Sequence, residues 1–250
     1  MRTPRIYQAV PLSAGEVIEL DNQATIHLTR VLRLKSGDEL LVFNGKGGEF
    51  KARVAQVERR VSYVELLEFV DSSLESALEM VLVQGVSRGE RMDYTVQKAV
   101  ELGVTRIVPV ITERTVVNVK GERKEKRQLH WQAVVNSACE QSGRNQVPEV
   151  MPIQSLNDWL ADESMANAVK LVLHHRAKTS LGEITQTGGP VILLIGPEGG
   201  LAPAEISAAQ AAGYLSLRLG PRVMRTETAA VAALSVLQWV WGDLGVAGAP

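Results

Sequence analysis

The stretch VILLIGPEGG, residues 191–200, constrains the fold of this 250-residue chain more than any other. Its first half is a short apolar run rich in branched side chains, which predicts a strand buried on both faces of a parallel sheet. Its second half predicts a tight turn, because Gly196, Gly199 and Gly200 permit positive φ and close approach to the backbone. The following residues, LAPAEISAAQAAG, predict a helix with Pro203 in its first turn and Gly213 after its last. The segment is therefore expected to form a strand, a glycine turn and a helix.

This glycine turn differs from the common phosphate-binding loops. No Lys-Ser or Lys-Thr pair follows the glycines, which excludes a Walker loop, and the spacing is not that of a dinucleotide fingerprint. An ordinary βα turn without any ligand is the simplest alternative.

Two further apolar runs end in the same abrupt way. VKLVLHH, residues 169–175, turns polar at its end, and LSLRLG, residues 215–220, ends in glycine. A polar loop and a long apolar helix from about Thr228 to Trp241 follow the second run. In an open parallel sheet, ligands bind outside the carboxyl ends of the strands. We therefore expect the three ends, near His174, Gly196 and Gly220, to surround one crevice.

Two motifs carry a family resemblance. GPEGGLAPAEI followed by LGPRVMRTETA resembles the C-terminal signature of the ribosomal RNA small-subunit methyltransferase E family. That family belongs to the SPOUT superfamily of S-adenosylmethionine-dependent RNA methyltransferases. The resemblance implies an α/β fold, with a C-terminal SPOUT-type parallel sheet that contains a trefoil knot, preceded by a small PUA-like β-barrel. It also implies a homodimer formed through the last helix. The residue pattern itself does not predict a knot, since unknotted connections are the default.

The chain divides in two by pattern. Residues 1 to about 70 contain strand candidates (EVIEL, ELLVF, EFKARVAQV, VSYVELLEF) and one helix, NQATIHLTRVLRL, which Asp21 is placed to cap. The polar stretch DSSLES, residues 71–76, is the best boundary, and strands alternate with helices after it. We predict a PUA-like RNA-binding barrel over residues 1–72. A SPOUT methyltransferase domain over residues 73–250 is predicted to bind S-adenosylmethionine and to dimerise.

Composition limits the possible partners. The formal net charge is −1, so RNA binding requires local basic patches. The single cysteine, Cys139, excludes an intrachain disulfide and is expected to be a buried apolar residue. No apolar run has the length of a signal peptide or a membrane span, so we expect a cytoplasmic protein without a membrane partner. His174 and His175 should point to opposite faces of a strand and no ligand cluster accompanies them, so we expect no metal.

The expected cofactor is S-adenosylmethionine. Backbone groups of a glycine turn suit its adenine and ribose, and no phosphate has to be neutralised. The residues expected to hold it are Leu173, His174, Gly196, Pro197, Glu198, Gly199, Gly200, Leu219, Gly220, Met224, Thr226 and Ala229.

The resemblance implies methylation of N3 of a uridine in the decoding region of 16S ribosomal RNA, in the small subunit. N3 carries a weakly acidic proton, so something has to favour the anion or accept the proton. We expect Arg225 to orient a uracil carbonyl and to stabilise negative charge on the ring. Glu227, Glu140 or Glu198 is the expected proton acceptor, and the sequence does not choose among them.

Substrate contacts are expected from basic and polar residues in both halves. In the N-terminal half and the loop after residue 84 these are basic side chains, for which a solvated surface is the alternative. The substrate residues after residue 139 belong to an EQSxR segment, which the resemblance implies lines the active cleft. The alternative is a frayed helix end with Gly143 as its cap. The expected substrate residues are Arg2, Arg5, Arg30, Arg33, Arg88, Gln141, Ser142 and Arg144.

Two other functions compete with methyl transfer. A nucleotide- or dinucleotide-dependent enzyme on a doubly wound sheet would need a phosphate-binding fingerprint, which is absent. A non-catalytic RNA-binding module would use the N-terminal barrel alone, which leaves two elaborate glycine loops unexplained.

Overall fold

Two compact units make up the chain in the computed structural model, which describes residues 3–117, 121–162 and 164–245. The first unit comprises residues up to Glu75 together with Asn136–Val147, and the second comprises Ser76–Val135 and the residues from Pro148 onward. The predicted division between residues 72 and 73 does not include a second segment, Asn136–Val147, in the N-terminal unit. The functions predicted for the two domains stay predictions.

The first unit is built on a five-stranded sheet in the order β1-β3-β4-β5-β2. Only the β1–β3 pair is parallel. One face covers a core of aliphatic side chains, among them Ile6, Leu28, Val42 and Leu66, which are fully buried. The strands are β1 (Arg5–Tyr7), β2 (Val17–Glu19), β3 (Glu39–Phe43), β4 (Glu49–Val57) and β5 (Ser62–Val70).

The helix predicted near the N-terminus ends earlier than expected. Asp21 caps α1 (Asn22–Ile26) as expected, by accepting a 2.8 Å hydrogen bond from the backbone of Ala24. A π-helical turn, His27–Val31, continues it. Arg33 then adopts a positive φ of 57°, which a helix cannot accommodate, so the helical run stops before Leu34.

The second unit is organised around a parallel sheet in the order β12-β10-β11-β6-β7-β8, with β9 also paired to β7. This confirms the predicted α/β class. Its strands are β6 (Met80–Gly85), β7 (Arg106–Ile111), β8 (Glu149–Val150), β9 (Gln154–Ser155), β10 (Val169–Leu173), β11 (Val191–Ile195) and β12 (Leu215–Leu217). All five residues of β11 are buried, as expected of a strand covered on both faces.

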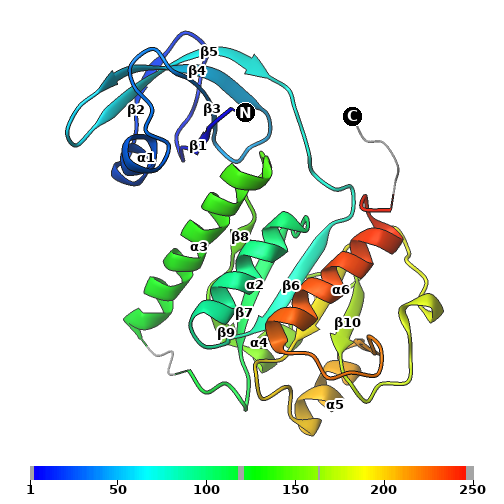
Figure 1. The fold of residues 1–250 in the computed structure, drawn as a ribbon. Helices are drawn as coiled ribbons and strands as arrows, with labels where there is room; N and C mark the ends of the chain where they lie inside the picture. The colour runs from blue at the N-terminus through cyan, green and yellow to red at the C-terminus, as the bar shows by residue number, and fades with distance from the viewer. Residues whose placement is uncertain (1–2, 118–120, 163, 246–250) are drawn as a thin grey trace. The chain divides into compact units, whose positions relative to one another are not determined.

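Helices cover both faces of this sheet. Val81 and Val83 of β6 belong to one core cluster with residues of α4 and α5, while Met80 and Leu82 alternate to the opposite face. There α2 and α6 lie side by side (Figure 1). The helices are α2 (Glu90–Glu101), α3 (Glu122–Ser142), α4 (Leu156–Leu160), α5 (Pro203–Ala211) and α6 (Thr226–Trp241), with a short 3₁₀ turn at Leu181–Glu183.

The helix that follows the glycine turn begins as its sequence predicts. Pro203 occupies its first turn, and Glu205 accepts a 2.8 Å hydrogen bond from the backbone N–H of Ala202. The other Glu205 oxygen accepts from the backbone N–H of Glu113 at 2.7 Å. The loop after β7 is thereby joined to the start of α5.

The trefoil knot implied by the family resemblance stays a prediction.

Candidate cofactor site

Three strand ends meet at one edge of the parallel sheet. β10 pairs with β11 on one side and with β12 on the other, so the carboxyl ends of all three are neighbours. A cavity of about 220 Å³ lies there. The ends that the sequence singled out are therefore adjacent in space, at the position where open α/β sheets bind ligands.

Eleven of the twelve residues predicted to hold the cofactor line this cavity. They are Leu173, His174, Gly196, Pro197, Glu198, Gly199, Gly200, Leu219, Met224, Thr226 and Ala229. Gly220 is not among the lining residues, but it directly follows one of them and supplies a positive φ of 67°. Four lining residues were missed, namely His175, Ile195, Arg222 and Val223. His175 and Ile195 directly adjoin predicted residues, and Arg222 and Val223 lie within the second motif, which was the available signal.

The glycine turn is as compact as backbone packing allows. Gly200 has a φ of 66° and donates a 2.8 Å hydrogen bond to the carbonyl of Pro197. A side chain on Gly196 would come within 2.8 Å of the backbone of Gly200 and Leu201. Gly85, at the end of β6, is equally confined. A Cβ added to it would lie 2.5 Å from the ring of Pro197. These glycines let the backbone itself form the cavity wall.

A buried hydrogen-bond cluster fastens this turn to the start of α6. The hydroxyl of Thr226 donates to the carbonyl of Gly196 at 2.7 Å. Gln84 of β6 in turn donates to that hydroxyl at 3.0 Å and to the carbonyl of Gly85 at 3.0 Å. Gln84 and Thr226 are both buried, where unmet polar groups are costly, so these bonds specify one arrangement of the three segments.

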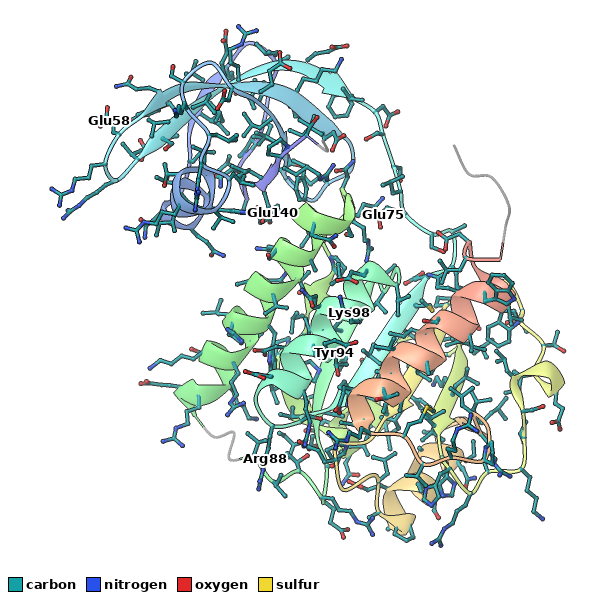
Figure 2. The ribbon with its side chains drawn as sticks, viewed as in Figure 1. Glu58, Glu75, Arg88, Tyr94, Lys98 and Glu140 are labelled. Carbon is teal, nitrogen blue, oxygen red and sulfur yellow. The ribbon has the colours of Figure 1, made fainter. Side chains whose placement is uncertain are left out.

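Glu198 is held from the loop that leads into α2. Its carboxylate accepts hydrogen bonds from the backbone N–H of Arg88 at 2.8 Å and from the Arg91 guanidinium at 3.2 Å. Burial alone would raise the pKa of Glu198, but these donors lower it below its ordinary value. Arg88, an expected substrate residue, is exposed in this loop (Figure 2).

Arg225 and Glu227 lie together at the N-terminus of α6. Arg225 is exposed at the N-cap position and makes no side-chain capping bond. Glu227 Oε1 lies 3.8 Å from Nε of Arg91. Its Oε2 is buried, and no hydrogen-bond partner for it occurs among the residues that the structure describes. Glu227 directly follows Thr226, which lines the cavity.

Both histidines after β10 line the cavity, which corrects the expectation that they point to opposite faces. The strand ends at Leu173, so the alternation of side chains no longer applies to His174 and His175. Their rings meet edge to face, with centroids 5.5 Å apart. Burial, assisted by the neighbouring His175 and Arg176, lowers the pKa of His174.

Glu140, the third carboxylate expected near the chemistry, belongs to the first unit. It lies in the last turns of α3 (Figure 2). Its two oxygens engage the backbone N–H of Tyr7 at 3.0 Å and Nδ1 of His27 at 3.1 Å. The hydrogen bond to Glu140 raises the pKa of His27. A second cavity, of about 460 Å³, adjoins this pair within the same unit.

The expected substrate residues of the first unit fall into two groups. Arg5 is buried, pairs with Glu49, and donates to the carbonyl of Arg144 at 3.0 Å. Arg144 is buried as well and pairs with Glu75 at 2.6 Å. Both arginines thus hold the unit together from inside. On its surface lie the exposed Arg30, Arg33 and Gln141 and the half-buried Ser142, while Arg2 lies outside the described residues.

The composition of the cavity suits a nucleoside cofactor. Exposed backbone of the glycine turn offers donors and acceptors without bulk, and apolar walls from Leu173, Ile195 and Leu219 suit a base. In the described part of the chain, no group of three or more His, Cys, Asp or Glu side chains is arranged to hold a metal ion. Nor is any described helix long and apolar enough to cross a bilayer.

Comparison with protein families agrees with this architecture. A family model described as an RNA methyltransferase domain matches residues 74–238, and one described as an RNA methyltransferase PUA domain matches residues 20–67. The second match confirms the expected PUA-like character of the N-terminal unit.

Individual relatives align over nearly the whole chain. Ribosomal RNA small subunit methyltransferase E of Buchnera aphidicola (from Schizaphis graminum) is 35% identical over 97% of this chain and 98% of its own length. The protein of that name from Mycobacterium tuberculosis is 33% identical over 89% of this chain and 86% of its own. A crystal structure of the Neisseria gonorrhoeae protein, bound to S-adenosyl methionine, is 41% identical and superposes with a TM-score of 0.93, covering 97% of this chain and 99% of the other.

Proposed function

The chain belongs to the ribosomal RNA small subunit methyltransferase E family, and from this premise we propose that it methylates N3 of one uridine in 16S ribosomal RNA. The broader activity, S-adenosylmethionine-dependent methylation of ribosomal RNA, follows from the named relatives and the cofactor-bound crystal structure. The observation that carries the proposal is the cavity at three adjacent strand ends, lined mostly by residues of the two motifs.

When bound, S-adenosylmethionine supplies an activated methyl group on a sulfonium. The chain's own contribution is to hold and orient it. The glycine turn Gly196–Gly200 and the segment Leu219–Met224 would form two walls, and Thr226 and Ala229 of α6 would close a third. Because Thr226 is bonded to Gly196, these walls are set before any ligand enters, which reduces the ordering that binding requires.

We assign proton acceptance to Glu227 from the three carboxylates left open by the sequence. Glu198 already accepts two hydrogen bonds and has a lowered pKa, which makes it a weak base. Glu140 is engaged by His27 and by a backbone N–H of its own unit. Glu227 has one oxygen 3.8 Å from Arg91 and one without a donor among the described residues, so its carboxylate is the one of the three left to accept a hydrogen bond from a uracil N3–H.

Arg225 is proposed to stabilise the negative charge that develops on the uracil ring. Loss of the N3 proton to Glu227 would leave negative charge spread over N3 and the two uracil carbonyls. That charge is consumed as N3 bonds to the methyl carbon and the methyl–sulfur bond breaks, with its electron pair left on sulfur. An exposed guanidinium two residues from Glu227 can hydrogen-bond such a carbonyl and stabilise that charge.

Substrate binding is proposed for exposed residues of both units. Arg30 and Arg33 of the first unit and Arg88 of the second are available at the surface for phosphate contacts. We further propose that the substrate is the RNA within the small subunit, that α6 mediates a homodimer, and that the protein acts in the cytoplasm. Large exposed apolar side chains on α6, Val236, Trp239 and Val240, support the dimer.

Nucleoside mass spectrometry of small-subunit RNA from cells with and without this protein tests the proposal. We expect one 3-methyluridine to disappear in its absence and to return with the wild-type gene. An unchanged modification profile would contradict the proposed reaction. Calorimetry tests the competing functions separately, because tight binding of S-adenosylmethionine, without binding of NAD or ATP, is expected only of the methyltransferase.

A further inference from the structure

Arg222 is the one arginine or lysine among the described residues that line the cofactor cavity. The other charged group on the wall, Glu198, is already matched by Arg91 and by the backbone of Arg88. His174 has a lowered pKa and so favours its neutral form. Arg222 therefore provides the permanent positive charge of the cavity wall.

The position of Arg222 leaves its charge available to a ligand. It lies between Leu219 and Met224, which both line the cavity, in the segment that joins β12 to α6. The side chain is exposed at the cavity, and no ion pair to it occurs in the described part of the chain. Next to it, Val223 is 77% exposed, so the two residues form an uncovered rim.

The chemistry of the cofactor calls for such a group. S-adenosylmethionine carries an α-carboxylate at its amino-acid end, and placing a carboxylate against apolar walls is costly unless a cation accompanies it. A guanidinium offers two parallel N–H donors that match the two oxygens of a carboxylate. The apolar side chains Leu173, Leu219 and Val223 offer nothing equivalent.

We infer that Arg222 pairs with the α-carboxylate of the cofactor and thereby selects ligands that retain the amino-acid end. This inference rests on the proposed function, because it assumes that S-adenosylmethionine occupies the cavity. The competing role for an exposed arginine at this rim is a contact to a phosphate of the RNA, which would leave cofactor binding in the absence of RNA unaffected.

A calorimetric comparison of three ligands without RNA tests the inference. S-adenosylmethionine and S-adenosylhomocysteine both have the carboxylate, whereas 5′-methylthioadenosine retains the nucleoside and sulfur but lacks the amino-acid end. In Arg222→Gln we expect about tenfold weaker binding of the first two ligands, and less than about a twofold change for methylthioadenosine. Arg222→Lys, which keeps the charge without the fork, should fall in between.

Arg176→Gln is the matched control. Arg176 is exposed and close enough to affect His174, but it does not line the cavity, so its removal should weaken all three ligands alike or not at all. Equal losses for all three ligands in Arg222→Gln would indicate damage to the cavity and overturn the inference. Unchanged affinities for all three would overturn it as well. Failure of the wild-type protein to bind S-adenosylmethionine would instead contradict the proposed function.

Discussion

The hydroxyl of Thr226 donates a 2.7 Å hydrogen bond to the backbone carbonyl of Gly196, although the two residues lie 30 positions apart in the chain. The same hydroxyl accepts a hydrogen bond from Gln84 at 3.0 Å. The first residue of α6 therefore links the end of β6 to the turn after β11, and the cofactor cavity is shaped by this contact.

Replacing Thr226 with valine should destabilise the second unit and weaken cofactor binding. Valine keeps the shape but removes both hydrogen bonds, which leaves the buried amide of Gln84 with the carbonyl of Gly85 and a longer, 3.4 Å contact to the carbonyl of Gly196. We expect the free energy of unfolding to fall by about 1–3 kcal/mol in chemical denaturation. Thr228→Val, an exposed change on the same helix, should have an effect below about 0.5 kcal/mol. Equal stability of the two variants would argue against the linking role of Thr226.

Arg225→Ala should retain cofactor binding and lose methyl transfer. Arg225 does not line the cofactor cavity, so its truncation should leave the Kd for S-adenosylmethionine unchanged. Loss of charge stabilisation on the uracil should lower kcat about 100-fold or more in assays with small subunits. Nearly full activity in this variant would remove Arg225 from the mechanism.

Glu227→Gln should slow the reaction in a way that rising pH relieves. The amide cannot accept the N3 proton as the carboxylate does, so we expect kcat to fall about 100-fold near neutral pH. At higher pH more of the uridine loses its proton to solvent, and the activity of the variant should approach that of the wild type. A deficit that stays constant with pH would contradict proton acceptance by Glu227.

His27 should titrate above its ordinary pKa of 6.5, because the hydrogen bond to Glu140 favours the charged imidazole. The raised folded-state pKa means that this pair stabilises the first unit at pH values below about 6.5. The stabilisation is lost as pH rises through the folded-state pKa. Titration by NMR should show the raised value in the wild type, and Glu140→Gln should lower it. An identical pKa in both proteins would show that Glu140 does not control His27.

The exposed apolar residues of α6 should hold the protein as a dimer. Light scattering at micromolar concentration is expected to give twice the mass of one chain, and the double variant Trp239→Glu, Val240→Glu should give the monomer mass, since charges there would oppose burial. Leu129→Glu is the control, because Leu129 is 69% exposed on α3, away from the proposed interface. A monomeric wild type would contradict the homodimer.

Local pattern alone predicts several elements in both units. The buried run Val191–Ile195, the proline and glycine at the two ends of α5, and the cap at Asp21 all depend on neighbours within a few residues. The two glycine motifs also located nine of the cavity residues, and the apolar run ending near His174 located two more, because each lies at the end of a strand and parallel strands bring their carboxyl ends to one edge.

Tertiary structure decided which polar side chains are exposed to a ligand and which are buried in ion pairs inside the protein. Arg5 and Arg144 look like surface bases in the sequence, yet both are buried with carboxylate partners 44 and 69 residues away. β1 was missed because its partner, β3, lies more than thirty residues further along the chain. The sequence does not distinguish Glu198, Glu140 and Glu227 as candidate proton acceptors. Only their hydrogen-bond partners in the folded chain do. Partners brought together from distant parts of the chain leave no periodicity in the sequence, since folding alone determines their proximity.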